Sequence, residues 1–85
     1  MKFTFTEIKT TRNKFQSLTK IEEEIYEYRR TREDENEDEE AIDILHSAET
    51  FIRKQFHGRE EVLDKLIEQV ILKNKERGYY SHKCF

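Results

Sequence analysis

Two pairs of carboxylates share a three-residue spacing in this chain: Glu24 with Glu27, and Glu40 with Asp43. Side chains three residues apart on a helix project from neighbouring positions on one face. If two helices that carry these pairs pack antiparallel, the four carboxylates can converge, as ligands from facing helices do in helical bundles. Clustered carboxylate oxygens suit a hard cation such as Mg²⁺, which can neutralise phosphate charge and orient an attacking water. The pattern therefore predicts a candidate magnesium site.

The alternative interpretation is a solvated acidic face. Residues 21–40 contain eleven acidic and three basic residues, so acidic pairs at this spacing also arise by chance. Carboxylates held close together disfavour one another's ionised forms, and a fold that gathers them usually gains a bound cation in return. Spacing alone leaves both interpretations open. The acids that we assign to a solvated linker are Glu33, Asp34, Glu35, Glu37 and Asp38.

Three amphipathic helices are expected to position these residues, because apolar side chains recur at three- and four-residue steps. The expected helices cover residues 13–32, 37–56 and 59–77. Asp34 or Asn36 is available to cap the second helix, while Gly58 and Gly78 are suited to end the second and third. The side chains expected to face inward are Phe15, Leu18, Ile21, Ile25, Tyr28, Ile42, Leu45, Ala48, Phe51, Ile52, Phe56, Val62, Leu63, Leu66, Ile67, Val70 and Ile71.

The chain divides into an N-terminal arm at 1–12, a helical domain at 13–80 and a C-terminal tail at 81–85. In the arm, Phe3 and Phe5 alternate with threonines, which is typical of a short strand or an extended segment. Because no second strand is visible in the sequence, we favour an arm. Its two phenylalanines are expected to pack onto the helical body or onto a neighbouring copy.

Composition favours an all-α domain whose own core is thin. The chain has 85 residues, of which 41% are charged and 34% hydrophobic, with no proline and two glycines. A domain of this size buries only about 60–65% of the surface that its unfolded chain exposes. We therefore expect a small bundle of three main helices that is completed by homo-oligomerisation, as a homodimer or a homotetramer.

The same composition argues against several classes of protein. The net charge is −3, and the basic residues near the start do not extend into the domain-wide basic footprint of a nucleic-acid-binding protein. No apolar run approaches the roughly 18–20 residues that cross a bilayer, and the start lacks a signal-peptide core. Cys84 is the single cysteine and can form no internal disulfide, so the cytoplasm is the expected location.

Three segments taken together resemble the MazG-like, all-α nucleoside triphosphate pyrophosphohydrolases. The sequence KIEEEIYE at 20–27 is similar to the family's K-x-x-E-E-x-x-E segment. The sequence EEAIDIL at 39–45 is similar to its E-E-x-x-D-x-L segment, and KNKERGYY at 73–80 looks like its closing basic motif. The segments occur in the family's order, and the resemblance covers residues 15–80.

The resemblance implies a reaction and a metal site. The family cleaves nucleoside triphosphates between the α and β phosphates and releases a nucleoside monophosphate and pyrophosphate. By this resemblance Glu24 or Glu27 would orient or deprotonate the attacking water, and Glu23 would support the ligands from behind. The implied ligands of Mg²⁺, for which Mn²⁺ can substitute, are Glu24, Glu27, Glu40 and Asp43.

The resemblance also implies substrate contacts near the end of the third helix, at Lys73, Asn74 and Arg77. Their donors suit a triphosphate, although cations at a helix C-terminus also complement the helix dipole. Tyr80 is either a stacking surface for the base or a cover for the end of the bundle, and Tyr79 is assigned to packing. Lys20 either belongs to the site or pairs with Glu24 one turn on.

Some residues depart from the family pattern or suggest other chemistry. The family often has small residues where this chain has bulky ones, at Tyr26, Tyr28 and Ile42. His82 and Cys84 could form half of a zinc site, but no second paired-ligand motif accompanies them, so we favour a tail without zinc. His46 is expected to be a packed or hydrogen-bonded histidine.

The favoured function is thus a Mg²⁺-dependent nucleoside triphosphate pyrophosphohydrolase. The alternative is a non-catalytic helical module that binds a protein or senses a nucleotide on the same scaffold. The presence of all four carboxylates favours the enzyme, because a regulator need not retain them.

Overall fold

The computed structural model describes residues 1–9, 11–30 and 37–81, and these contain three helices and no strand. Helix α1 spans Lys14–Arg30, α2 spans Glu37–Gln55 and α3 spans Glu60–Glu76. The all-α prediction with three main helices is confirmed for this part of the chain. The predicted bounds agree to within one residue, except that the predicted end of the first helix at 32 lies outside the described residues. The predicted caps Asp34 and Asn36 lie outside the described residues. No described helix is long and apolar enough to cross a membrane.

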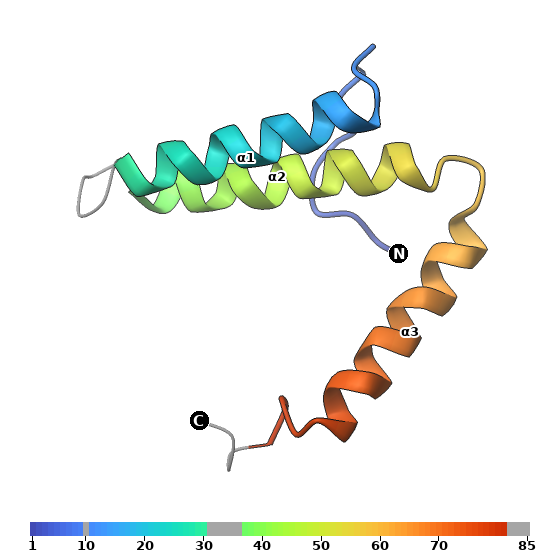
Figure 1. Cartoon of the computed structure of the whole chain (residues 1–85). Helices are drawn as coiled ribbons and strands as arrows, with labels where there is room; N and C mark the ends of the chain where they lie inside the picture. The colour runs from blue at the N-terminus through green and yellow to red at the C-terminus, as the bar shows by residue number, and fades with distance from the viewer. Residues whose placement is uncertain (10, 31–36, 82–85) are drawn as a thin grey trace.

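Helices α1 and α2 form an antiparallel hairpin, and α3 leads away from it at an angle (Figure 1). Helix α3 does not run alongside either helix of the hairpin, but its first turn, which carries the buried Leu63, lines a cavity together with Phe3 and Arg53. This arrangement matters for the candidate site, because α1 and α2 carry the four predicted carboxylates and α3 carries the predicted phosphate contacts.

Local signals set the helix ends. At the start of α1, the backbone N–H of Gln16 donates to Asn13 Oδ1 at 2.9 Å, and the N–H of Asn13 donates to Gln16 Oε1 at 2.8 Å. This reciprocal pair is a capping box, which satisfies two amides at the helix start. Gly58 and Gly78 follow the ends of α2 and α3 with φ of +74° and +78°, a conformation that glycine adopts readily. A Cβ at Gly58 would meet nothing within 4 Å, so the backbone conformation is the reason for glycine there.

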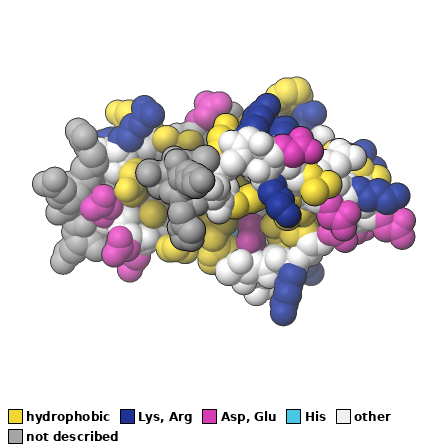
Figure 2. Space-filling view, turned by 90° about the horizontal axis from the view of Figure 1, so that it is seen from below, with side chains coloured by type: hydrophobic (Ala, Val, Ile, Leu, Met, Phe, Trp, Pro, Cys, Tyr) yellow, Lys and Arg dark blue, Asp and Glu magenta, His cyan; other side chains and the backbone are white. Residues whose placement is uncertain are grey.

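The apolar core is thin, as composition predicted. Among the described residues, Leu63 is the one buried hydrophobic side chain, whereas the buried polar residues are Ser17, Glu24, Glu49 and Thr50. The prediction that the apolar stripes face inward is wrong for many positions, since a two-helix hairpin covers one face of each helix and α3 does not return to cover more. The predicted inward residues that are exposed are Phe15, Leu18, Ile25, Ile42, Leu45, Val62, Leu66, Val70 and Ile71. Figure 2 shows hydrophobic side chains reaching the surface between charged ones.

The N-terminal arm is anchored on α2 by a buried carboxylate. The backbone N–H groups of Thr4 and Phe5 both donate to the carboxylate of Glu49 at 3.0 Å, and Glu49 is 5% exposed. The guanidinium of Arg53 donates to the carbonyl oxygen of Phe5 at 2.6 Å. The backbone of the arm therefore bonds to side chains of α2 and not to a second strand. The predicted extended arm is observed in place of the short strand that the alternating residues also allowed.

Ring contacts complete the docking of the arm. Phe5 stacks on the ring of His46 with centroids 4.3 Å apart, and the guanidinium of Arg53 lies 4.3 Å from the ring centroid of Phe3. The terminal amine pairs with Asp64 on α3. The predictions that both phenylalanines pack onto the helical body and that His46 is a packed histidine are therefore confirmed.

We expect Glu49→Gln to release the arm. Burial opposes ionisation of Glu49, but the backbone hydrogen bonds from Phe5 and Thr4, with the charge of Arg53, outweigh it, so the pKa of Glu49 is lowered. A lowered pKa means that the anchoring is complete above the ordinary glutamate pKa and is lost as the pH falls through the folded value. In Glu49→Gln, amide exchange at Thr4 and Phe5 should accelerate at least about tenfold at neutral pH, because bonds to an ionised acceptor are among the stronger ones.

Two-dimensional NMR of the amides tests this expectation. In the wild type, the Thr4 and Phe5 signals should move toward random-coil positions only on acidification, and in Glu49→Gln they should lie there at every pH. Glu68→Gln, at an exposed position of α3, is the matched control. Unchanged exchange in Glu49→Gln would show that ring contacts alone hold the arm.

Candidate metal centre

Three of the four predicted carboxylates meet across the hairpin. Glu24 of α1 and Glu40 and Asp43 of α2 each offer one oxygen, and these oxygens all lie within 4.8 Å of one another. Glu24 is 9% exposed, Glu40 is half-buried and Asp43 is exposed. The antiparallel packing of α1 on α2 brings these side chains together, as the paired spacing predicted. Three oxygens from two helices at this separation can surround a hard cation.

Glu27 lies outside this group and is exposed. A three-residue step turns a helix by about 300°, so Glu27 points roughly 60° away from the direction of Glu24. Because Glu24 faces α2, Glu27 is turned toward solvent. Glu27 remains near the group, because its negative charge contributes to raising the pKa of Glu40.

The surroundings of Glu40 disfavour its ionised form. Burial is the largest cause that raises the pKa of Glu40, and the charges of Asp43, Glu24, Glu27 and Glu39 raise it further, in that order. A group whose charged form is penalised by burial and by like charges is relieved when a cation binds. The raised pKa of Glu40 is thus a second property, besides distance, that fits a bound divalent cation.

We expect Glu40→Gln to stabilise the metal-free protein at neutral pH. The pKa of Glu40 is raised on folding, so its ionisation destabilises the fold as the pH rises from the ordinary glutamate value through the folded one. Glutamine resembles the protonated carboxyl and avoids that loss. Thermal melts of the metal-free proteins should therefore show a higher melting temperature for Glu40→Gln at pH 7 and no difference below the ordinary glutamate pKa. A lower melting temperature for the variant at neutral pH would contradict the repulsion described above.

Lys20 pairs with the most buried carboxylate of the cluster. Its Nζ lies 2.8 Å from Glu24 Oε1 and 3.9 Å from Glu23 Oε2. The hydrogen bond to Glu24 is the main reason that the pKa of Lys20 is raised. The alternative that Lys20 pairs with Glu24 one turn on is confirmed. Glu23 is exposed and approaches Lys20, so its link to the cluster runs through that lysine.

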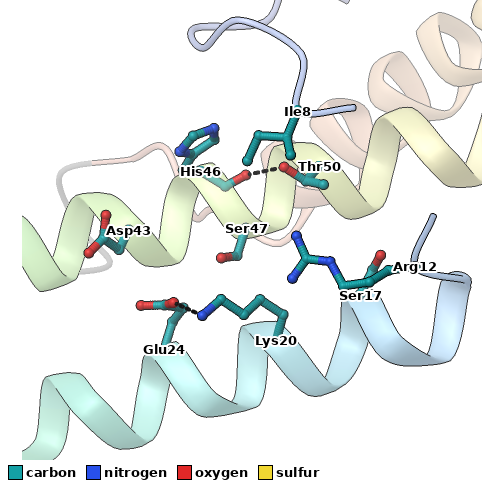
Figure 3. A pocket seen from close by; sticks show the side chains of 9 residues that line it. All are labelled: Ile8, Arg12, Ser17, Lys20, Glu24, Asp43, His46, Ser47 and Thr50. Atoms are coloured by element: carbon teal, nitrogen blue, oxygen red, sulfur yellow. Dashed lines mark hydrogen bonds and ion pairs between the residues drawn. The ribbon is translucent and has the colours of Figure 1, made fainter. Parts of the chain in front are cut away.

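A cavity of about 120 Å³ opens beside Glu24 and Asp43, between the arm and the hairpin (Figure 3). Sequence reasoning did not single out most of its residues, because they come from three segments whose meeting depends on the docking of the arm. The further side chains that line it include Ile8, Arg12, Ser17, Lys20, Ser47 and Thr50. The three-residue spacing of the acidic pairs predicted which helix faces carry carboxylates. No sequence pattern predicts that residues of the arm line the cavity.

The residues of the closing basic motif lie away from the carboxylates within one chain (Figure 1). Lys73 and Asn74 belong to the last turn of α3, and Arg77 caps it. The N–H groups of Gly78 and Tyr79 donate to the carbonyls of Lys75 and Asn74, at 3.0 and 2.9 Å, as in a Schellman motif. The backbone of this motif thus forms the C-terminal cap of α3. Its position there fits the alternative interpretation, in which the basic side chains complement the helix dipole. Tyr80, beyond it, is exposed.

The departures from the family pattern do not fill the cavity. Tyr28 is half-buried, and its hydroxyl donates to Glu37 at 3.2 Å, which joins the end of α1 to the start of α2. Tyr26 and Ile42 are exposed, at 60% and 52%. None of the three lines the space beside the carboxylates. The side chains of Tyr26 and Ile42 therefore lie at the surface, and that of Tyr28 lies where the end of α1 meets the start of α2.

The described residues contain one group of potential metal ligands with three or more members. This group is the acidic cluster, and it contains no histidine. His82 and Cys84, the candidate half of a zinc site, lie outside the described residues.

Comparison with known proteins adds no assignment. No protein-family model, no curated protein and no solved structure matches this chain. The candidate function therefore rests on the carboxylate geometry and on the motifs in the sequence.

Proposed function

We propose that this protein is a Mg²⁺-dependent nucleoside triphosphate pyrophosphohydrolase. The observation that carries the proposal is the approach of Glu24, Glu40 and Asp43 to within 4.8 Å across two helices. Hard oxygen donors and a raised pKa at Glu40 fit Mg²⁺, with Mn²⁺ as a substitute. The resemblance of the three sequence motifs to the MazG-like family supplies the reaction class.

The proposed mechanism assigns separate tasks to the carboxylates. Glu24, Glu40 and Asp43 would hold Mg²⁺, and the bound ion would neutralise phosphate charge and polarise the α-phosphate. Glu27 is exposed beside the cluster and belongs to no three-carboxylate group, so it is the better placed of the two candidate bases to accept a proton from water. The water oxygen bonds to the α-phosphorus, the bond to the β-phosphate bridging oxygen breaks, and pyrophosphate leaves.

We include self-association in the proposal, as a homodimer or homotetramer. Leu63 is the one buried hydrophobic residue among those described, and α3 exposes Val62, Leu66 and Val70 at four-residue steps on one face. A second copy that covers this face would bury apolar surface that the single chain leaves in water. Such a copy is also the route by which Lys73, Asn74 and Arg77 would reach the carboxylates of its neighbour.

The alternative remains a non-catalytic helical module that binds a protein or senses a nucleotide. The exposed apolar face of α3 favours this alternative as much as it favours a second copy. If the acidic cluster binds a partner through ion pairs, that binding should weaken as the salt concentration rises. A non-catalytic module would hydrolyse no nucleotide.

The decisive experiment is a nucleotide panel. Each (deoxy)nucleoside triphosphate is incubated with the protein and Mg²⁺, and the release of pyrophosphate is compared with the release of single phosphate. Pyrophosphate as the main product supports the proposal. Single phosphate as the main product contradicts the cleavage site, and no turnover of any nucleotide favours the non-catalytic alternative.

A further inference from the structure

The cavity beside the metal centre carries negative groups at one end and donor groups at the other. Figure 3 shows Glu24 and Asp43 on one side, Arg12 and Ser17 on the other, and Lys20 between them. The guanidinium of Arg12 reaches from the arm into the space between α1 and α2. A ligand in this space would face a cation-binding cluster and a set of hydrogen-bond donors together.

Ser17 contributes a buried hydroxyl for which the structure provides no partner. The residue is 2% exposed, lines the cavity, and its Oγ has no hydrogen-bond partner in the structure. A buried hydroxyl without a hydrogen bond is unfavourable, and such groups in native proteins usually have a bound partner. An acceptor atom placed in the cavity would satisfy Ser17.

Two cations face the same space. Arg12 and Lys20 both line the cavity, and the Nζ of Lys20 lies 2.8 Å from Glu24 Oε1. Like charges brought together in this way are stabilised by an anion between them. The Lys20 ammonium has three donors, so its bond to Glu24 leaves others for a ligand. The planar fork of an arginine matches the oxygens of a phosphate.

We propose that Arg12, Ser17 and Lys20 form a phosphate-binding subsite that opens onto the carboxylates of the metal centre. The cavity of about 120 Å³ has room for a phosphate group. This inference rests on the proposed function for the origin of the phosphate, which is a nucleoside triphosphate or the pyrophosphate product. It places a phosphate contact on the N-terminal arm and α1, within the same chain as the carboxylates.

The anchored arm supplies part of the cavity wall. Arg12 follows the arm segment that Glu49 and Arg53 hold on α2, and Ile8 of that segment lines the cavity. Arg12 precedes Asn13, whose capping bonds with Gln16 fix the start of α1, so the guanidinium enters the cavity from a defined backbone position.

The test is calorimetric titration of the full chain with inorganic pyrophosphate and, separately, orthophosphate, each with and without Mg²⁺. Arg12→Gln should weaken pyrophosphate binding at least about tenfold, because charge-assisted hydrogen bonds are lost. Ser17→Ala should weaken it severalfold and leave the melting temperature of the ligand-free protein unchanged or higher, since a buried hydroxyl without a partner is removed. Arg29→Gln, at an exposed position in the last turn of α1, is the matched control and should bind as the wild type does.

The outcomes separate this subsite from the proposed function. Pyrophosphate affinity that is unchanged in both Arg12→Gln and Ser17→Ala overturns the subsite, even if nucleotides are hydrolysed. Loss of affinity in Arg77→Gln with none in Arg12→Gln overturns it in favour of the closing basic motif. Affinity that depends on Arg12 supports the subsite, even if the nucleotide panel shows no turnover and the proposed function fails.

Discussion

Asp43→Asn is expected to remove both Mg²⁺-dependent stabilisation and hydrolysis. The substitution keeps the size of the side chain but removes one of the three charges that approach to within 4.8 Å. Since a bound metal supplies several kcal/mol of transition-state stabilisation, turnover should fall at least about a hundredfold. The metal-free variant should melt at the same or a higher temperature than the wild type, because repulsion with Glu40 is relieved. Thermal melts with and without Mg²⁺ measure the first effect and pyrophosphate release the second.

Two further variants make the result interpretable. Glu22→Gln changes an exposed glutamate of α1 that lies outside the cluster, and it should keep the Mg²⁺-dependent rise in melting temperature. Glu27→Gln should lower turnover with a smaller loss of Mg²⁺-dependent stabilisation, because Glu27 lies beside the three ligands. If Asp43→Asn keeps both full turnover and the response to Mg²⁺, the carboxylates are a solvated face and no metal site exists.

Leu66→Glu is expected to convert a homo-oligomer into a monomer. Leu66 is 40% exposed at the centre of the α3 face that also carries Val62 and Val70. A charge buried there against a second copy would lack a partner, and desolvating it is costly. The dissociation constant of the oligomer should rise at least about a hundredfold. Size-exclusion chromatography with light scattering at micromolar concentration measures the change directly.

Lys65→Glu is the control for this experiment. It introduces negative charge at an exposed position about 100° around the helix from Leu66 and should leave the oligomer intact. Circular dichroism of both variants verifies that α3 still forms. A wild-type protein that is monomeric at micromolar concentration would refute the self-association proposal and favour a different partner for this face.

The helices of this protein are readable from the amino-acid order because their signals are local. Apolar residues at three- and four-residue steps, the capping pair of Asn13 and Gln16, and the glycines at 58 and 78 each act within one or two helical turns. Interactions over so short a distance depend little on the rest of the fold. For that reason the all-α class and the helix bounds could be predicted closely.

The candidate metal centre was predictable in part, and the limit has a geometric cause. The three-residue spacing of the acidic pairs indicated which faces carry carboxylates, and an antiparallel hairpin was enough to join Glu24 with Glu40 and Asp43. Which member of the first pair faces α2 depends on the rotation of α1 about its axis, and spacing does not contain that angle. Only the packed hairpin therefore shows that Glu27 stands outside the group.

Contacts between distant segments were decided by the tertiary structure alone. Glu49 receives the amides of Thr4 and Phe5 from more than forty residues away, and no periodicity in either segment encodes that meeting. The direction of α3 likewise depends on one turn after α2, and that direction leaves Lys73, Asn74 and Arg77 remote from the carboxylates within the chain. Periodic patterns specify which face of an element is apolar, whereas the partner of that face is chosen by the free energy of the whole packed arrangement.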